Sequence, residues 1–204
     1  ENAPRLARSL RQAVRQKSLE TADRMKIPRW QDAAVRNAAQ QERSPLFVAT
    51  PDATRLDDVA TCTFRGAPDD LARLGFAVAH EIDAASAAVP NLSDEVGALG
   101  RQIAEALRNA KRPLVVTGTG CSSAAVIQAA ANVAWALCGV GRAAELSFAI
   151  PECNSLGLSL IGGHALQDAF DAVEQGAAET VIVLENVLYR RAERAAVDRC
   201  LNRA

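Results

Sequence analysis

The stretch between Arg112 and Leu137 combines a short apolar run, a turn bracketed by two glycines and an alanine-rich run, in the order RPLVVTGTGCSSAAVIQAAANVAWAL. Residues 114–116 include no polar position, which is typical of a strand buried on both faces of a helix-covered parallel sheet. Beyond the turn, apolar residues recur at the three- or four-residue spacing of a helix face. The stretch therefore predicts a strand, a tight turn and a helix, a unit of α/β folds.

The glycine turn resembles part of a nucleotide-binding signature. Gly118 and Gly120 flank Thr119, so the backbone can turn sharply and direct its N–H groups toward an anion at the start of the next helix. The third position of the G-x-G-x-x-G fingerprint is Ser123, and no acidic residue closes a clear second strand about 20 residues later. On these residues alone, a tight turn without a ligand explains the pattern.

Five cysteines are spread along the chain without a C-x-x-C pair, a pattern that favours a reduced, cytosolic setting and offers no zinc or iron–sulfur ligand set. Cys121 lies where a helix is expected to begin, and the helix dipole there favours a thiolate. Neither histidine can be placed beside it, so a structural cysteine is the default interpretation. We therefore predict no catalytic residue and no metal ligand.

Apolar runs alternate with helical patterns along most of the chain. The expected strands are 45–49, 59–64, 113–116, 146–150 and 180–184. The expected helices are 2–25, 30–41, 68–82, 93–112, 126–137 and 166–173. Crossover connections of this length favour parallel strands and right-handed connections. We expect a three-layer α/β/α fold with a mostly parallel, Rossmann-like sheet of about five strands. Residues 1–204 are expected to form a single α/β domain, with possible subregions 1–90 and 91–204.

Open α/β sheets bind ligands beyond the carboxyl ends of their strands. Here those positions are the glycine turn, the loop 151–163 and the pair Glu185–Asn186. They give a candidate small-molecule site that consists of Gly118, Thr119, Gly120, Cys121, Ser122, Asn154 and Asn186.

Charge and composition narrow the classes of partner. Lys and Arg total 23 and Asp and Glu total 24, so a net charge of −1 offers no field that attracts nucleic acid. A basic stretch, Arg5, Arg8, Arg11 and Arg15, is explained by a solvated helix face or by docking of an acidic partner.

No apolar run reaches the roughly 18 residues of a membrane span. The low aromatic content, 4%, and abundant alanine favour closely approaching helices. Because the sequence starts at Glu1 without a signal peptide, we expect a piece of a longer protein.

Several stretches together resemble the G subunit of bacterial NADH-quinone oxidoreductase, respiratory complex I. They are IPRWQDAAVRN, SPLFVATPDATRLDD, RPLVVTGTGCSSAAVIQAAANVAWAL, PECNSLGLSLIGG and VIVLENVLYRRA. The resemblance runs through nearly the whole chain but covers an interior part of that subunit, within the portion that is similar to molybdopterin-dependent oxidoreductases. It implies that the fold is retained while the pterin cofactor has been lost, so the candidate residues above are vestigial.

The resemblance also implies a role. The parent complex transfers electrons from NADH through iron–sulfur clusters to quinone, coupled to proton translocation, and its [4Fe-4S] and [2Fe-2S] clusters lie outside this part. A structural or assembly domain is then expected, with other peripheral-arm subunits as partners, at the cytoplasmic face of the inner membrane. The alternative is a domain that binds a nucleotide- or pterin-type molecule, and a free-standing oxidoreductase lacks a recognisable hydride or metal site. One departure is Val187, where the family's E-N-D-L has an acid that can cap the following helix.

Overall fold

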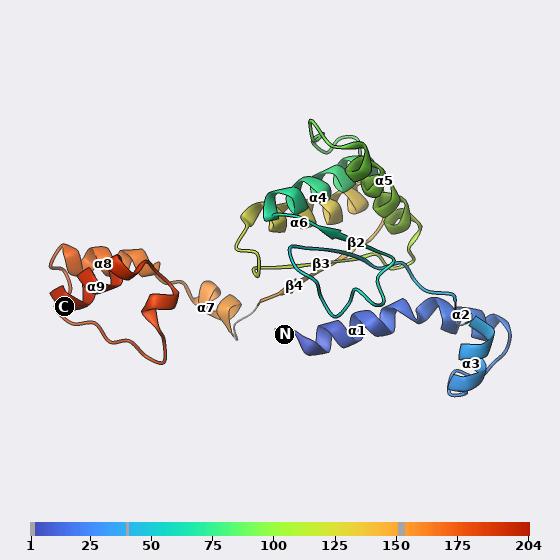
Figure 1. Cartoon of the computed structure of the whole chain (residues 1–204), viewed down its shortest axis with the longest axis horizontal. Helices are drawn as coiled ribbons and strands as arrows, with labels where there is room; N and C mark the ends of the chain where they lie inside the picture. Colours follow the sequence, from blue (N-terminus) through green and yellow to red (C-terminus); the bar gives the residue numbers. More distant parts are fainter. Residues whose placement is uncertain (1–2, 40, 151–153) are drawn as a thin grey trace. The chain divides into compact units, whose positions relative to one another are not determined.

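The computed structural model describes residues 3–39, 41–150 and 154–204, and the chain divides into two compact units, residues 1–153 and residues 154–204. The first unit begins with α1 (Pro4–Val14), α2 (Gln16–Arg24) and α3 (Asp32–Ala39). It continues with β1 (Phe47–Thr50), β2 (Cys62–Arg65), α4 (Pro68–Ile82), α5 (Asp94–Asn109), β3 (Leu114–Gly118), α6 (Ala124–Gly139) and β4 (Glu145–Ala149) (Figure 1). The expectation of a single domain over 1–204, with a possible boundary near residue 90, stays a prediction.

The strands of the first unit form two parallel pairs. Phe47 of β1 lies opposite Cys62 of β2, and Leu114 of β3 lies opposite Glu145 of β4. The predicted parallel pairing and the mixed α/β class are confirmed, whereas the single sheet of about five strands is wrong for the described residues, which hold two two-stranded sheets. The expected fifth strand, residues 180–184, has no strand structure. Its apolar, β-branched pattern fits a strand, but a pattern does not specify which backbone edge will pair with it.

Three helices cover one side of the strands in the first unit. Figure 1 shows α4, α5 and α6 as one layer, and their facing side chains make the main core. The core consists of Leu74, Val78, Ala79, Ile82, Ala104, Val133, Ala136 and Leu137. Gly75 of α4 lies against Ala129 of α6, and a Cβ added at Gly75 would be 2.9 Å from the Ala129 Cβ. The small side chains therefore let α4 and α6 approach closely, as the composition predicted.

The helix boundaries follow local signals. α4 begins at Pro68 and ends at Ile82, as predicted, with Asp69 and Asp70 in its first turn. Ser93 and Ser123 cap α5 and α6, because each hydroxyl accepts a hydrogen bond from the backbone N–H three residues later, at 3.3 and 3.4 Å. The predicted ends of these helices differ from the observed ones by a few residues.

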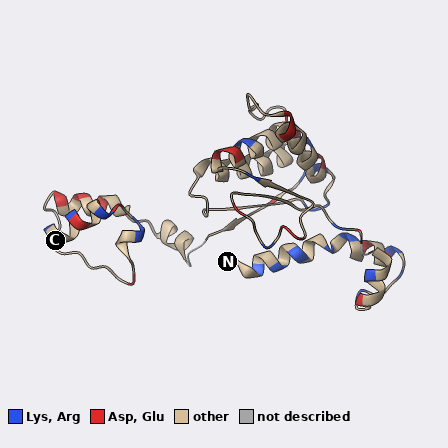
Figure 2. Ribbon diagram, in the orientation of Figure 1, with Lys and Arg blue, Asp and Glu red and all other residues tan. Residues whose placement is uncertain are grey.

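The first predicted helix, 2–25, is instead two helices that meet at Arg15. The Val14 carbonyl accepts a hydrogen bond at 2.8 Å from the backbone N–H of Ser44, a partner far along the chain that local periodicity does not reveal. Residue 2, where the predicted helix begins, lies outside the described residues. Figure 2 shows several basic positions, coloured blue, along the ribbon of α1. Arg5, Arg8 and Arg15 are exposed, which fits the solvated-face interpretation of that stretch.

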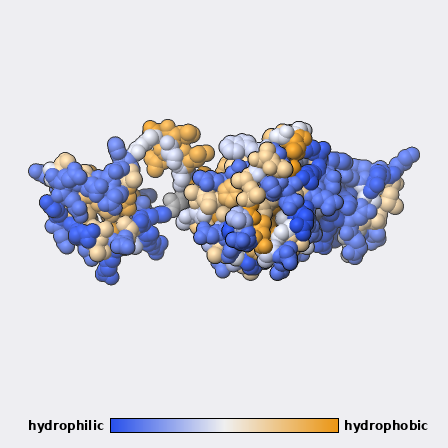
Figure 3. All heavy atoms as spheres, turned by 90° about the horizontal axis from the view of Figure 1, so that it is seen from above, coloured by the Kyte–Doolittle hydropathy of each residue, from blue (hydrophilic) through white to orange (hydrophobic). Residues whose placement is uncertain are grey.

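The second unit is helical in its described part. It contains α7 (Ser155–Ile161), α8 (Leu166–Glu174), a short 3₁₀ turn η1 (Leu188–Arg190) and α9 (Arg194–Arg203). Its small core joins α8 and α9 through Phe170, Val173, Val197 and Cys200. The sequence pattern predicted a loop over 151–163, which includes the residues of α7, and no helix over the residues of α9. Figure 3 shows apolar residues gathered on α7, where Leu156, Leu158, Leu160 and Ile161 are exposed.

Candidate functional site

The glycine turn lies at the carboxyl end of β3, immediately before α6, as the sequence predicted. Gly118 pairs with Ala149 of β4, and a Cβ at Gly118 would collide with the Ala149 carbonyl oxygen. The close approach of β3 and β4 therefore requires a glycine at position 118. This requirement holds whether or not the turn binds a ligand. Nothing lies within 4 Å of a Cβ position at Gly120, so that part of the turn faces open space.

The next residues of the turn, Cys121 to Ser123, lead directly into α6. Ser122 has a left-handed backbone with φ 49°, and its N–H donates to the Thr119 carbonyl at 3.0 Å. Ser123 then caps the helix. Cys121 is partly exposed and is not in a disulfide. The turn is thus closed by its own backbone, and Gly120 lies on its open side.

The two asparagines of the predicted site belong to the second unit. Asn154 has φ 59° and precedes α7, and its side chain lies against Gly157, where a Cβ would collide with the Asn154 amide. Asn186 lies in the irregular segment before η1, next to Glu185, whose φ is 47°. Val187 forms no side-chain cap for η1, and the following element is only one 3₁₀ turn. The candidate site assembled from the turn and both asparagines stays a prediction.

The loop between β1 and β2 carries a polar network that the sequence analysis did not single out. Asp57 accepts hydrogen bonds from the Thr54 hydroxyl at 2.8 Å, from the Thr54 N–H at 3.0 Å and from the Arg65 guanidinium. Arg65 also donates to the Thr50 hydroxyl at 2.8 Å. The Arg65 hydrogen bond, followed by those of Thr54, lowers the pKa of Asp57 to about 2. Asp57 therefore stays ionised at neutral pH. Its carboxylate holds Thr54 and Arg65 together and so fixes the conformation of the loop.

A neighbouring ion pair joins this loop to the first helix. Arg11 of α1 donates to both carboxylate oxygens of Asp58, at 2.9 and 2.8 Å. The hydrogen bond from Arg11 lowers the pKa of Asp58. Arg11 also donates to the Arg55 carbonyl. These groups form a structural clamp, because each charge is turned toward a protein partner. One member of the basic stretch therefore has a defined role within the first unit.

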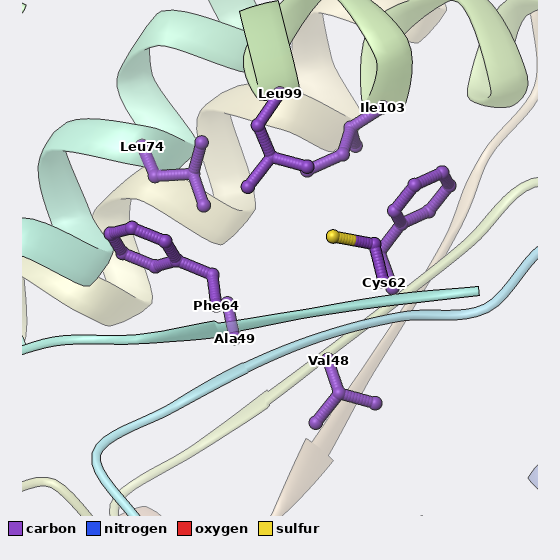
Figure 4. A pocket seen from close by; sticks show the side chains of 8 residues that line it. Val48, Ala49, Cys62, Phe64, Leu74, Leu99 and Ile103 are labelled. Carbon is purple, nitrogen blue, oxygen red and sulfur yellow. The ribbon is translucent and has the colours of Figure 1, made fainter. Parts of the chain in front are cut away.

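Apolar side chains pack between the helices and the part of the β1–β2 sheet around Cys62 and Phe64. Leu74, Leu99 and Ile103 point toward the sheet face that carries Cys62 and Phe64 (Figure 4). The cavity among them has a volume of about 10 Å³, roughly one water molecule. The space directly among these side chains is therefore core.

The chemistry that the described residues assemble is limited. Within residues 3–39, 41–150 and 154–204, no group of three or more His, Cys, Asp or Glu side chains is arranged to hold a metal ion. None of the helices in that part combines the length and apolar character that crossing a membrane demands. The fold is mixed α/β, and the glycine turn between β3 and α6 is closed by strand pairing and a serine cap.

Several known proteins similar to this chain are named the G subunit of NADH-quinone oxidoreductase. The Pseudomonas fluorescens protein is 48% identical over 204 residues, all of this chain and 23% of the relative. The Pseudomonas putida protein is 49% identical over 201 residues, and that of Escherichia coli strain K12 is 44% identical over 200 residues, in each case 98% of this chain and 22% of the relative. No family model matches the chain. The resemblance to the G subunit is confirmed along the whole chain, which spans less than a quarter of the length of these relatives.

Proposed function

We propose that this chain is a structural and assembly part of the G subunit of a bacterial NADH-quinone oxidoreductase. The observation that carries the proposal is 44–49% identity over 98–100% of the chain to proteins of that name. In this role the chain contributes packed surface to the large peripheral-arm subunit and contacts other subunits at the cytoplasmic face of the inner membrane. The parent complex passes electrons from NADH to quinone through [4Fe-4S] and [2Fe-2S] clusters held elsewhere, and couples this transfer to proton translocation.

The packing of the described residues supports a structural role. The α4–α6 contact is so close that a Cβ at Gly75 would lie 2.9 Å from the Ala129 Cβ, and Leu74, Leu99 and Ile103 pack toward Cys62 and Phe64 of the β1–β2 sheet. The hydrogen-bonded carboxylates Asp57 and Asp58 fix a loop instead of facing an open cleft. A domain of this kind contributes to the complex through its shape and its surface.

Two variants of the parent complex test the proposal. Gly75→Leu separates α4 from α6, and we expect less assembled complex, with NADH-to-quinone electron transfer per assembled complex unchanged. Cys121→Ala changes the open side of the glycine turn without changing the packing, so we expect wild-type amounts and wild-type activity. A fall in activity per complex in Cys121→Ala, with normal assembly, would overturn the structural role.

The second candidate function is binding of a nucleotide- or pterin-type molecule at the glycine turn. The open space at Gly120 and the position of the turn at the carboxyl end of β3 favour it. In this case the backbone N–H groups of Gly120 and Cys121 would bind phosphate oxygens. Calorimetric titration with NADH, guanine nucleotides and molybdopterin dinucleotide tests it. No heat and no thermal shift at millimolar ligand would remove this function.

A further inference from the structure

Helix α1 and Arg15, which follows it, carry positive charge without any carboxylate. Residues 4–15 contain four arginines and no Asp or Glu, and Figure 2 shows several of these basic positions along the ribbon. The first 43 residues hold ten Lys or Arg against five Asp or Glu, whereas residues 44–204 hold 13 against 19. The net charge of −1 is therefore divided between a basic beginning and an acidic remainder.

Two faces of α1 use its arginines differently. On one face, Arg11 donates to Asp58 and Val14 is buried, so this face packs on the first unit. The other face, which we call the arginine face, is exposed and consists of Arg5, Arg8 and Arg15. Their spacing of three and seven residues aligns them along about 15 Å of helix. Within residues 3–39, 41–150 and 154–204, no carboxylate forms an ion pair with the arginine face.

The arginine face lowers the stability of its own helix. Arg5 lies in the first turn of α1, where the helix dipole favours a carboxylate. Helices α4 and α5 follow this rule, with Asp69 and Asp94 in their first turns. Arg5 and Arg8 also repel each other, because they lie about one turn apart. Such a departure from local folding rules is typical of a binding surface, where a partner supplies the missing charge.

The surroundings of the arginine face favour the carboxylates of a protein as its partner. A basic helix that binds a membrane inserts its apolar side into the lipid, but in α1 Leu6 and Leu10 are half-buried and Val14 is buried. A nucleic acid would meet the acidic surplus of residues 44–204, which repels phosphates. Carboxylates pair with guanidinium groups through two parallel hydrogen bonds, as Asp58 does with Arg11.

Most of the protein that can supply these carboxylates belongs to the same polypeptide. The chain spans 22–23% of the length of its G-subunit relatives, so most of such a subunit lies outside residues 1–204. A partner on the same polypeptide is present at high effective concentration and is favoured over a separate protein. We propose that the arginine face docks on an acidic surface in the rest of the G subunit. This inference rests on the proposed function, because it takes the chain to be part of that subunit.

Carbodiimide crosslinking of the assembled complex locates the carboxylates. Arg5→Lys, Arg8→Lys and Arg15→Lys keep the positive charge and add an amine, which carbodiimide joins to a carboxylate in direct contact with it. Each variant is expected to give a crosslink, identified by mass spectrometry of peptides, to an Asp or Glu of the G subunit outside residues 1–204. Arg101→Lys on α5 is the matched control, since Arg101 is exposed and has no carboxylate partner in the described ranges, and it is expected to give none.

The sign of a stability change separates docking from solvation. On a solvated face, Arg5→Glu places a carboxylate in the first turn of α1 and removes the repulsion with Arg8, so the melting temperature of the full-length G subunit would rise. On a docked face the same change brings two carboxylates together, so we expect the melting temperature to fall. Replacing the carboxylate that Arg5→Lys captures by lysine should then restore it. If Arg5→Glu does not fold, the lysine variants decide, because they keep the charge.

Four outcomes would overturn the docking of the arginine face. The first is an assembled complex in which none of the three lysine variants gives a crosslink, and the second is crosslinking of Arg101→Lys at the same frequency. The third is crosslinking only to another subunit or only within residues 1–204. The fourth is a melting temperature that rises in Arg5→Glu. All four leave the structural role standing, because Gly75→Leu tests that role separately by the amount of assembled complex.

Discussion

Replacing Gly75 by alanine tests the closest helix contact in the first unit. The new Cβ would lie 2.9 Å from the Ala129 Cβ and 3.7–3.8 Å from the Ala129 backbone, so α4 and α6 must move apart. Overpacking of this kind costs about 1–3 kcal/mol. It opposes the gain of about 1 kcal/mol that alanine brings to a helix interior in place of glycine. The change in the free energy of unfolding of Gly75→Ala alone is therefore smaller than the steric cost, because the helix-propensity gain offsets part of it.

Gly97→Ala in α5 isolates the steric cost. A Cβ at Gly97 meets only the end of the flexible Arg101 side chain, at 3.6 Å, so this variant gains the helix propensity alone. Gly75→Ala should therefore be less stable than Gly97→Ala by about 1–3 kcal/mol. Urea unfolding followed by far-ultraviolet circular dichroism measures the difference from the transition midpoints and slopes. Equal stabilities of the two variants would refute the tight α4–α6 packing.

Three further predictions concern single polar groups. Ser123→Ala removes the α6 cap and should lower the free energy of unfolding by about 1 kcal/mol in urea titrations. Thr117→Val replaces a buried hydroxyl without a partner and should raise the melting temperature, whereas a lower one would show that the hydroxyl is paired. The lowered pKa of Asp57 makes its carboxylate stabilising above about pH 4, and this contribution should be lost as the pH falls toward about 2. In Asp57→Asn that part of the acid dependence, measured by unfolding at a series of pH values, should disappear.

Elements with strong local signals were predicted well. Pro68 and the acids that follow it fix the start of α4, and the apolar stripe continues to Ile82, where the helix ends. Ser123 and the glycines before it likewise indicate where β3 ends and α6 begins. These signals succeed because helix capping and side-chain periodicity involve residues within about one turn of each other.

Elements that depend on distant partners were predicted less well. The break between α1 and α2 accompanies a hydrogen bond from Ser44 to Val14, and no residue near Arg15 indicates it. The polar network around Asp57 was missed, although a carboxylate eight residues before Arg65 was a visible signal. In the candidate site, the sequence placed the glycine turn correctly at the end of β3, but only the structure shows that strand pairing requires Gly118.

The sequence by itself determined the alternation of elements in the first unit, the β-turn-α unit around the glycine turn and the resemblance to the G subunit of the oxidoreductase. The tertiary structure decided which strands pair, that they form two separate pairs in the described residues, and how closely α4 approaches α6. The physical reason is the range of the interactions. Caps and periodicity act between neighbours in the chain, whereas strand partners and helix contacts join residues tens of positions apart, where many pairings satisfy the same pattern.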